Sequence, residues 1–361
     1  MKLSYLTIWA LALEMSLTVS CGGVGSELLD EAAEEAGVEE ELPGANGGRG
    51  LGPGRRGDGG GGGGFEDLAL ADNTPDDNPT TTAGAALGRV LFYDQQLSLS
   101  NTTSCGSCHI QELGFADGTR LSTGFDGQLT GRNSMSLANA KYYRNGRFFW
   151  DERAETLEEQ VLMPIQDELE MGLEIDVAVS RIASDSSYTS LFESAFGDGE
   201  VTSDRMAKAL AQFVRSMESF DSRFDQGLAL SGGIREDFPN YSDLENQGKS
   251  LFFSRRNRCA SCHRAPAFVA TRARNNGLGA GAMKVPSLKN IALTGPYMHD
   301  GRFDSLEQVV EHYSSGIAGG GRGIRNLNLS DGEKSALVAF LRTLTDETFL
   351  NDPQFSDPNR L

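Results

Sequence analysis

Two copies of one five-residue motif constrain this chain more than any other feature of its sequence. The pattern Cys-x-x-Cys-His occurs at Cys105–His109 and again at Cys259–His263. Two thiols at this spacing can form thioether bonds with the vinyl groups of haem, and the histidine that follows can ligate the iron. The sequence therefore predicts two covalently bound haem c groups, one held by Cys105, Cys108 and His109 and one by Cys259, Cys262 and His263.

Zinc and disulfide sites are the alternatives for such cysteine pairs. In a zinc site the two pairs usually stand about 15 to 20 residues apart, whereas Cys259 follows Cys108 by 151 residues. A disulfide or a redox dithiol would not require the adjoining histidines. The chain has only 4 histidines in 361 residues, and two of them directly follow a cysteine pair. That coincidence favours haem over both alternatives.

The charge of the chain limits its partners. The formal net charge of −19 and the sequence pI near 4.6 argue against nucleic acid, whose binding depends on basic patches. Eight acidic residues and no basic one lie between Glu27 and Glu41, so the rest of the chain is less acidic than the total implies. An acidic surface can also attract a basic redox partner over a distance.

The N-terminus, residues 1–21, has the pattern of an export signal. Lys2 precedes an apolar run from Leu3 to Leu13, which is too short for a stable membrane span. Export agrees with haem attachment, which in bacteria takes place outside the cytoplasm. Cys21 follows Ser20 and resembles the acceptor of a lipoprotein signal, although Thr18 stands where such signals usually carry leucine. We expect a periplasmic protein, with a lipid anchor at Cys21 favoured over a freely soluble form.

The rest of the chain divides into a tether and two domains. Residues 22–81 combine an acidic run with a Gly/Arg/Pro stretch and six consecutive glycines, Gly59 to Gly64, so they cannot bury enough apolar surface to fold. The remaining length exceeds the usual size of one core, and each half carries one haem motif. We expect an N-terminal haem domain over 82–231 and a C-terminal, electron-transfer haem domain over 240–361.

Helical patterns dominate both predicted domains. Leu87, Val90 and Leu91 recur at helical spacing before the first haem motif, and capping boxes begin at Ser242 and Ser330. The stretch from the first haem motif to Trp150 is rich in Gly, Asn and Ser, and no strand-rich segment is evident. The sequence predicts a mainly α fold of two cytochrome-c-like haem domains with long loops.

The histidine count separates the two haems. His109 and His263 are the expected proximal ligands, which leaves His299 and His312. Both of these lie in the second half of the chain. The first haem therefore has no histidine of its own domain for the sixth position of its iron, and an open iron can meet a small oxidant.

Several further motifs carry a resemblance to one family. They are Leu91-Phe92-Tyr93-Asp94, Phe115-Ala116-Asp117-Gly118, Gly131-Arg132-Asn133, Phe149-Trp150-Asp151-Glu152-Arg153-Ala154, Glu170-Met171, Lys284-Val285-Pro286-Ser287-Leu288 and Tyr297-Met298-His299-Asp300-Gly301-Arg302. From about residue 84 to residue 345 the chain resembles the bacterial di-haem cytochrome c peroxidases and the related enzyme MauG. The resemblance implies a peroxidase that reduces hydrogen peroxide to water with electrons from a small redox protein, such as a cytochrome c or a cupredoxin. The alternative that it implies is a MauG-like enzyme that oxidises tryptophan or tyrosine residues of a partner protein.

The resemblance also implies an active site above the first haem. The glutamate of the family's site falls on Glu170, whose carboxylate can move a proton between the two oxygens of peroxide. The family's glutamine falls on Gln160, which would orient the peroxide, and Pro164 would shape the pocket. The tryptophan that lies between the two haems in the family falls on Trp150, as an electron relay.

The second haem is expected to be six-coordinate. The position of the family's distal methionine is occupied here by Tyr313, and MauG-type members use a tyrosine there as the axial ligand. His312, Met298 and Met283 are the alternative ligands. On a helix His312 and Tyr313 point about 100 degrees apart, so only one of them can face the iron. We favour Tyr313, and expect His299 to order the region between the haems by hydrogen bonding.

The family further implies a calcium ion between the haems, and its ligand positions match Asn133, Thr294 and Pro296. Amide and carbonyl oxygens suit this hard cation, although Asn and Pro in such positions also form ordinary turns.

Two departures from the family bear on function. No histidine lies between His109 and Gln160, so the first iron has no evident loop ligand to displace. The residues before Cys259 are Arg255-Arg256-Asn257-Arg258, without the tryptophan that MauG uses to reach a protein substrate. A third hypothesis is a non-catalytic electron-transfer protein, which would have two six-coordinate haems and no reaction with peroxide.

Overall fold

The computed structural model describes residues 72–317 and 324–359 and confirms the mainly helical fold. The expected export signal, Cys21 and residues 22–71 of the expected tether lie outside the described residues. Within the described part of the chain, no helix has the length and apolar character needed to cross a membrane. The α-helices are α2 (Thr82–Tyr93), α3 (Cys105–Cys108), α4 (Leu157–Gln166), α5 (Ile175–Ser184), α6 (Ser187–Phe196), α7 (Ser203–Ser216), α8 (Arg223–Leu230), α9 (Asp243–Phe253), α10 (Leu306–Glu311), α11 (Asp331–Arg342) and α12 (Glu347–Asn351).

Short elements occupy the loops between these helices. They are the 3₁₀ turns η2 (Gln95–Leu97), η3 (Gln111–Leu113), η4 (Ala140–Tyr142) and η5 (Cys259–Ser261), the π-helical turn η6 (His312–Gly316), and the strands β1 (Arg274–Asn275) and β2 (Ala282–Met283). The two strands are antiparallel and pair Arg274 with Met283 and Asn275 with Ala282. The long loops that the sequence predicts after each haem motif are therefore present.

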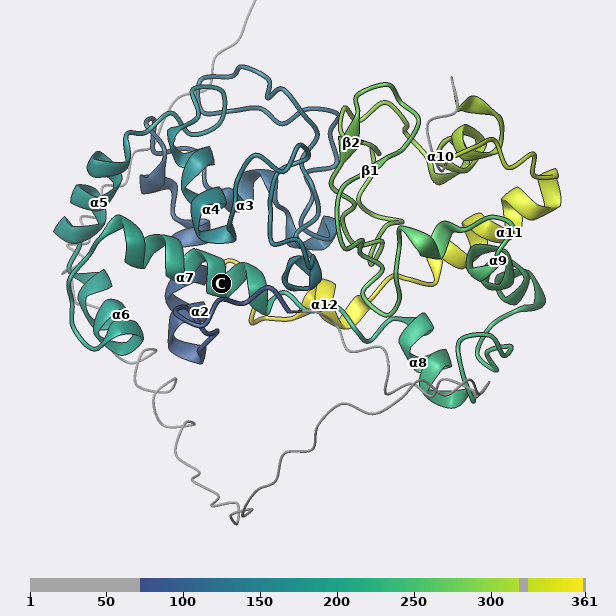
Figure 1. Ribbon diagram of the computed structural model, residues 1–361. Coiled ribbons are helices and arrows are strands. Elements are labelled where there is room, and N and C mark those ends of the chain that lie inside the picture. The colour runs from purple at the N-terminus through teal and green to yellow at the C-terminus, as the bar shows by residue number, and fades with distance from the viewer. Residues whose placement is uncertain (1–71, 318–323, 360–361) are drawn as a thin grey trace, which may run out of the picture. The chain divides into compact units, whose positions relative to one another are not determined.

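The same helix pair occurs once in each half of the described chain. Helix α2 packs on α7 in the first half, and α9 packs on α11 in the second half (Figure 1). A Cβ atom on Gly88 would lie 2.0 Å from the carbonyl oxygen of Ala209, and one on Gly248 would lie 1.9 Å from that of Ala336. The two helices of each pair thus make their close contact at a position that only glycine can occupy. In each half the first helix of the pair leads into a haem loop.

Side-chain caps fix where these helices begin. Thr81 accepts a hydrogen bond from the backbone N–H of Gly84 at 3.0 Å at the start of α2. The predicted capping boxes at Ser242 and Ser330 are confirmed at the starts of α9 and α11, with Glu245 and Glu333 bonding back to the capping residues. Because each cap satisfies backbone groups that the first turn leaves unpaired, it positions the helix relative to the loop before it.

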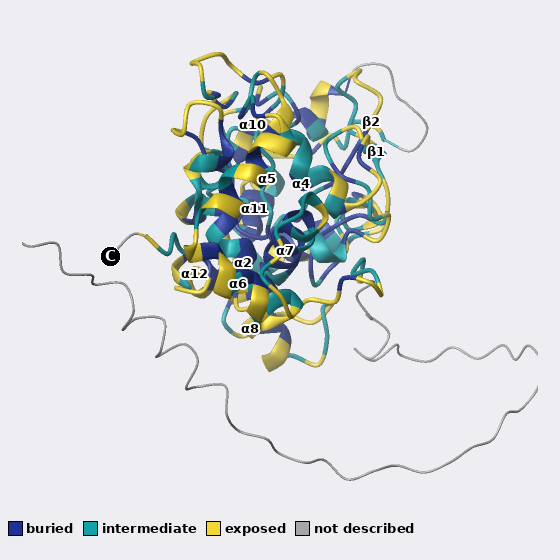
Figure 2. Cartoon of the chain, turned by 90° about the vertical axis from the view of Figure 1, so that its left-hand side faces the viewer, coloured by how far each residue is buried: buried dark blue, intermediate teal, exposed yellow. Residues whose placement is uncertain are grey.

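Each half has its own apolar core, rich in aromatic rings. Phe92, Phe115 and Phe213 pack edge to face in the first core. Phe224 and Phe268 do so in the second, with ring centroids 4.8 Å apart. Buried positions line the inner faces of the helices while exposed positions face outward (Figure 2).

Several side chains that follow Met217 pack in the second core. Met217 belongs to the first core, but Phe224, Leu228 and Phe238 belong to the second, and Phe224 and Phe238 are almost completely buried. The predicted first domain, 82–231, thus includes side chains that pack in the second core. Glycines and acidic residues make this stretch look like a linker, yet its aromatic side chains are part of a core.

Both ends of the described chain pack on the first half. Phe349 and Phe355 belong to the first core, and the Tyr93 hydroxyl donates to the carbonyl of Phe355 at 2.6 Å. Helix α12 lies in the middle of the molecule in Figure 1, and the chain runs from it to an end beside α2 and α7, so the last segment of the predicted domain 240–361 packs on the first core. Asn73 and Asn78, placed in the tether by composition, also bond to this half: Asn73 Nδ2 donates to Ala140 O at 2.9 Å.

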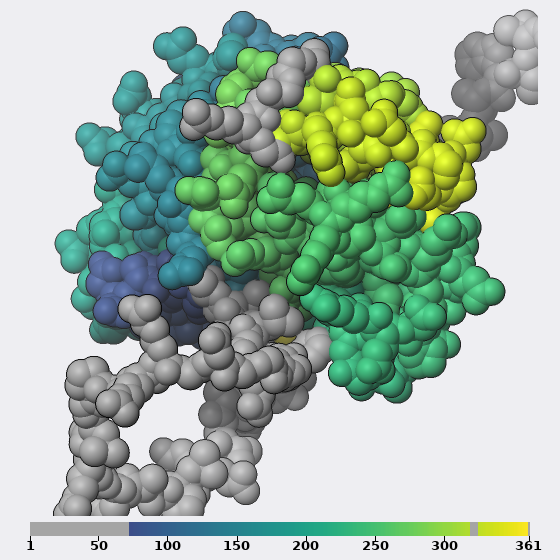
Figure 3. Space-filling view, turned by 45° about the vertical axis from the view of Figure 1, so that its right-hand side comes forward, coloured from purple at the N-terminus to yellow at the C-terminus, as the bar shows by residue number. Residues whose placement is uncertain are grey.

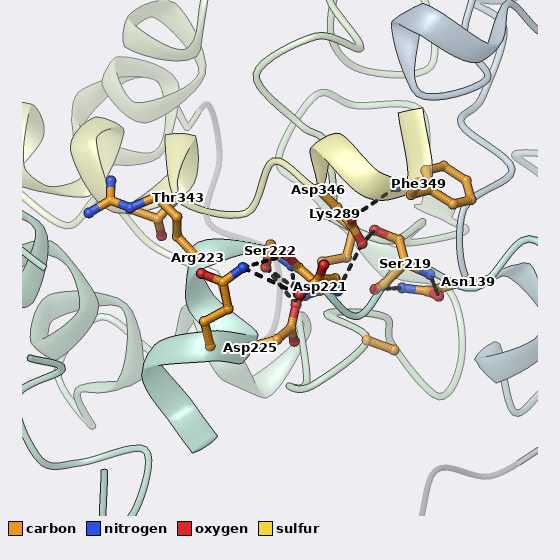
Figure 4. A network of polar contacts seen from close by, with 12 residues as sticks. Asn139, Ser219, Asp221, Ser222, Arg223, Asp225, Lys289, Thr343, Asp346 and Phe349 are labelled. Atoms are coloured by element: carbon orange, nitrogen blue, oxygen red, sulfur yellow. Dashed lines mark hydrogen bonds and ion pairs between the residues drawn. The ribbon is translucent and has the colours of Figure 1, made fainter. Parts of the chain in front are cut away.

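The chain passes between the halves twice, once near Ser219 and once near Asp346. A network of polar contacts joins these two segments (Figure 4). The carboxylate of Asp346 accepts from the Ser219 hydroxyl at 2.8 Å and from the Asp221 N–H at 2.9 Å. Asn139 of the first half bonds the backbone of Ser219, and Asn290 of the second half accepts from the Asp346 N–H at 2.8 Å. Asn139, Ser219, Asn290 and Asp346 are buried, so leaving one of them unpaired would cost about 1 to 3 kcal/mol, which holds the halves in one arrangement.

Candidate haem and peroxide site

The first haem loop presents its histidine in the state that a metal ligand needs. His109 ends the short helix α3, and its Nδ1 atom lies 2.8 Å from the carbonyl oxygen of Phe115. A carbonyl can only accept, so Nδ1 carries the proton and donates it. The lone pair of Nε2 is then available for iron.

The cysteines of the loops are suited to thioether bonds. Burial raises the pKa of Cys105 and of Cys259 to about 12, and that of Cys108 to about 11. Zinc ligation and thiol redox chemistry both need thiolates, which such surroundings disfavour. No disulfide joins these four cysteines, and no cluster of three or more His, Cys, Asp or Glu in residues 72–317 and 324–359 could hold a metal ion.

A cavity of about 420 Å³ lies against the first haem loop. Cys108 and His109 line one side of it. The residues expected at the active site line it as well: Trp150, Gln160, Pro164 and Glu170. Helix α4 supplies Gln160 and Pro164, and it continues through Pro164 to Gln166. The fold therefore brings together side chains that are far apart in the sequence.

Glu170 projects from a tight turn that follows α4. The turn is fixed by its backbone, since Glu170 N–H donates to Asp167 O at 3.0 Å and Phe125 N–H donates to Glu170 O at 2.9 Å. Burial raises the pKa of Glu170 to about 7, with a smaller contribution from the charge of Asp167 and an opposing one from Arg153. A carboxyl group with this pKa can both accept and donate a proton near neutral pH. It is therefore not the solvated carboxylate that its acidic neighbours suggest.

Trp150 lies where the two halves meet. Its Nε1–H donates to the carbonyl of Asn133 at 2.9 Å, and its ring stands edge-on to that of His299 with 6.4 Å between centroids. Its own carbonyl accepts from the N–H of Lys284 at 2.8 Å. An oxidisable indole thus lines the first cavity and touches the second half.

Tyr313 and His312 have different surroundings. Burial raises the pKa of Tyr313, and the charges of Cys262 and Cys259 in the second haem loop raise it further. The Nε2 atom of His312 lies 2.8 Å from the carbonyl of Asn276, and its ring packs on that of Phe303. The two residues open the π-helical turn η6, a feature often found at functional sites.

The other ligand candidates have different contacts. The sulfur of Met298 accepts from Asn276 Nδ2 at 3.6 Å, and Met283 lies in strand β2. Burial lowers the pKa of His263 to about 4, so its ring is neutral, as a ligand to iron must be. The side chains of His312 and Met298 both bond to Asn276, whereas within the described part of the chain the Tyr313 hydroxyl has no hydrogen bond.

The matches to known proteins fit this arrangement. The family model for "Di-haem cytochrome c peroxidase" matches residues 82–231. The methylamine utilization protein MauG of Methylorubrum extorquens is 34% identical over 299 residues, which cover 76% of this chain and 81% of MauG. The chain belongs to the di-haem cytochrome c peroxidase/MauG family. The cytochrome c551 peroxidase of Nitrosomonas europaea is equally similar, at 34% identity over 78% of this chain and 84% of the peroxidase.

A solved structure supports membership of the di-haem peroxidase/MauG family. It is the crystal structure of a MauG-like protein associated with microbial copper homeostasis, which is 34% identical in sequence. The likeness covers 81% of this chain and 98% of that one, with a TM-score of 0.69. The relatives thus include both peroxidases and MauG proteins, and the family carries two haem c groups.

The residues of both loops fit these haem c groups. In the first loop the buried thiols and the oriented His109 adjoin a cavity of about 420 Å³, and in the second loop His263 has Tyr313 near its cysteines. The expected calcium residues have mixed contacts. Asn133 Nδ2 donates to Thr119 O at 2.9 Å and its N–H donates to His299 O at 3.1 Å, so Asn133 does lie at the junction of the halves.

Lys284 is a cavity residue whose burial the sequence did not predict. It lines the first cavity from the second half, is 5% exposed, and places Nζ 3.1 Å from the ring centroid of Tyr143. Burial lowers the pKa of Lys284 well below its usual value, opposed by the charge of Glu152. The apolar residues beside it in the sequence, Met283 and Val285, are the pattern that could have indicated its burial.

Proposed function

We propose that this protein is a periplasmic di-haem peroxidase that reduces hydrogen peroxide to water with electrons from a small redox protein. The observation that carries this proposal is Glu170, a half-buried carboxyl group that lines the same cavity as His109 and whose pKa is raised to about 7. Haem c supplies the iron that exchanges electrons with peroxide. The chain's own residues must then bind peroxide, move its protons and keep water from competing.

Each cavity residue has a role in the proposed reaction. The Glu170 carboxylate takes the proton from one peroxide oxygen and returns it to the other, which leaves as water. The Gln160 amide orients the peroxide by hydrogen bonding, and Pro164 limits the space around it. Trp150 carries electrons from the second half to the first, supported by its contacts with Asn133 and His299.

The second haem is held by His263 and Tyr313 in this proposal. A phenolate oxygen is a hard ligand that stabilises the ferric state, whereas a thioether raises the reduction potential. The turn of His312 toward Asn276 supports Tyr313 as the ligand. A calcium ion on Asn133 and on the carbonyls of Thr294 and Pro296 would complete the junction.

Tyr313 also favours the alternative function, the MauG-like oxidation of tryptophan or tyrosine residues on a partner protein. A second haem that stabilises high oxidation states can store oxidising power for such a reaction. The surface before Cys259 favours the peroxidase, because its residues are arginines and asparagine, with no tryptophan to pass oxidising power outward.

One experiment separates these functions from simple electron transfer. The holoprotein is mixed with peroxide, first with a reduced small redox protein and then with candidate protein substrates. Rapid oxidation of the redox protein, with two electrons consumed per peroxide, supports the peroxidase. A site-specific mass change in a protein substrate without such turnover supports the MauG-like function. If the first haem neither binds cyanide nor reacts with peroxide, both the peroxidase and the MauG-like function are refuted.

A further inference from the structure

Charge is distributed very unevenly along this acidic chain. Residues 246–299 contain nine of its 32 Lys and Arg residues and none of its 51 Asp and Glu residues. Three of the nine, Lys249, Lys284 and Lys289, are buried, so the surface charge of this stretch comes from arginines. We call the exposed members the arginine segment: Arg255, Arg256, Arg258, Arg264 and Arg272.

The arginine segment lies on both sides of the second haem loop in the sequence. Arg258 directly precedes Cys259, Arg264 directly follows His263, and Ser261 between them is exposed. Backbone hydrogen bonds hold both ends of the loop, from Arg258 N–H to Ser254 O at 3.0 Å and from Arg264 N–H to Val269 O at 3.1 Å. Because thioether bonds at Cys259 and Cys262 would tie the haem to this loop, a redox protein that docks on its exposed surface would lie close to the second haem.

Few of these charges are neutralised. Among the described residues, the ion pair formed by the arginine segment is that of Arg256 with Glu333, at 2.9 Å. The first haem loop has the opposite charge, since the stretch from Asp94 to Asp117 contains three acidic residues and no basic one. The basic character is therefore specific to the second loop and does not follow from the haem motif.

We propose that the arginine segment is the docking surface for an acidic redox protein that exchanges electrons with the second haem. This inference rests on the proposed function and names the class of its electron donor. Each encounter passes one electron from the reduced partner to the second haem, and two electrons with two protons convert one peroxide to two waters. Complementary charge also steers such an encounter and can raise its rate by about 10- to 1,000-fold.

The net charge of the whole chain does not oppose this docking. It predicts attraction of a basic partner over a distance, but physiological salt screens charges beyond about 8 Å. Eight of the acidic residues also lie between Glu27 and Glu41, far along the chain from this loop. The charges at the contact surface itself therefore decide which partner binds.

An anionic membrane is a weaker candidate for this surface. Binding at a lipid surface uses apolar side chains that insert beside the basic ones. The exposed large apolar residues of the described chain are Leu99, Leu129, Val177, Leu230 and Leu244, and none of them lies within 246–299. The segment thus has charge without an apolar anchor, as an electron-transfer surface needs for rapid release.

The test uses the full-length holoprotein and two probes of opposite charge, an acidic plastocyanin-type cupredoxin and the basic mitochondrial cytochrome c. Binding is measured by calorimetry at low and at physiological ionic strength. The acidic probe should bind more tightly, and salt should weaken its binding. The double variant Arg255→Glu/Arg272→Glu should weaken it by about tenfold or more, while Arg144→Glu, an exposed arginine of the first half, should not.

Several results would overturn the inference. They are tighter binding of the basic probe, unchanged binding of the acidic probe to the double variant, or salt-sensitive binding to phosphatidylglycerol vesicles with none to the acidic probe. Peroxide turnover with the neutral donor guaiacol tests the proposed function separately and should be equal in wild type and variant. Absent guaiacol turnover beside charge-dependent binding would refute the peroxidase and support the docking surface.

Discussion

Replacing Glu170 with glutamine tests the proposed proton transfer most directly. Glutamine keeps the size and polarity of the side chain but cannot take up a proton from peroxide. General acid–base catalysis contributes about 10²- to 10⁴-fold in rate, which corresponds to about 3 to 5 kcal/mol of activation free energy. We expect Glu170→Gln to slow the reaction of the holoprotein with peroxide by that factor while haem content stays intact.

The neighbours of Glu170 predict how the pH dependence should move. Burial sets the pKa of Glu170 at about 7, so the rate of the wild type should rise as pH increases through that value. Asp167 raises this pKa and Arg153 lowers it. Asp167→Asn should therefore move the rise to lower pH and Arg153→Gln to higher pH, with the maximal rate retained in both.

The same substitution should also change stability, with a definite sign. The pKa of Glu170 is raised from 4.5 to about 7 in the folded protein, so the folded state binds the proton more tightly than the unfolded state. The stability associated with the protonated group is fully present below about pH 4.5 and is lost as pH rises toward 7. Glu170→Gln cannot ionise, so we expect it to unfold at a higher temperature than wild type at about pH 8, with little difference at about pH 5.

Stopped-flow absorbance of the ferric holoprotein after mixing with equimolar peroxide measures the rate, and thermal unfolding measures the stability. An unchanged rate constant for Glu170→Gln would remove Glu170 from the mechanism. If Glu170→Gln reacts slowly but the pH dependence of the rate is unchanged in Asp167→Asn and in Arg153→Gln, then another group carries the proton. If Glu170→Gln binds less haem than wild type, the two rates are compared per haem bound.

Three other changes test separate parts of the structure. Tyr313→Phe should raise the reduction potential of the second haem and alter its spectrum, whereas His312→Asn should leave its ligation intact; equal potentials in wild type and Tyr313→Phe would exclude the phenol as ligand. Trp150→Phe loses the indole hydrogen bond to Asn133 and should slow electron exchange between the haems after rapid partial reduction; an unchanged rate would exclude the relay. Gly248→Ala should destabilise the fold by about 1 to 3 kcal/mol or more in urea unfolding, because its Cβ would lie 1.9 Å from Ala336 O. Gly332→Ala, which meets no atom within 4 Å, is its control and should not destabilise.

Some features of this protein followed from local sequence patterns. The spacing of Cys, Cys and His within five residues determines both haem loops, because the geometry that the cofactor requires is short-range. The capping boxes at Ser242 and Ser330 correctly located the starts of two helices for the same reason, since a cap acts over four residues.

The core to which a side chain belongs could not be read in this way. The stretch that contains Phe238 looks like a linker, and the segment that contains Phe355 looks like part of the second domain. Each ring joins a core through contacts with residues far away in the chain, Phe238 in the second core and Phe355 in the first. Local composition carries no information about such partners.

The sequence by itself determined where two haems attach and which four histidines could serve them. Tertiary structure decided what surrounds each haem. Whether Glu170 is solvated or buried depends on the turn after α4 and on the cavity beside it, and whether His312 or Tyr313 faces the second loop depends on Asn276 and a π-helical turn. The physical reason is that ligation motifs act within a few residues, whereas desolvation and side-chain direction are set by groups that only folding brings together.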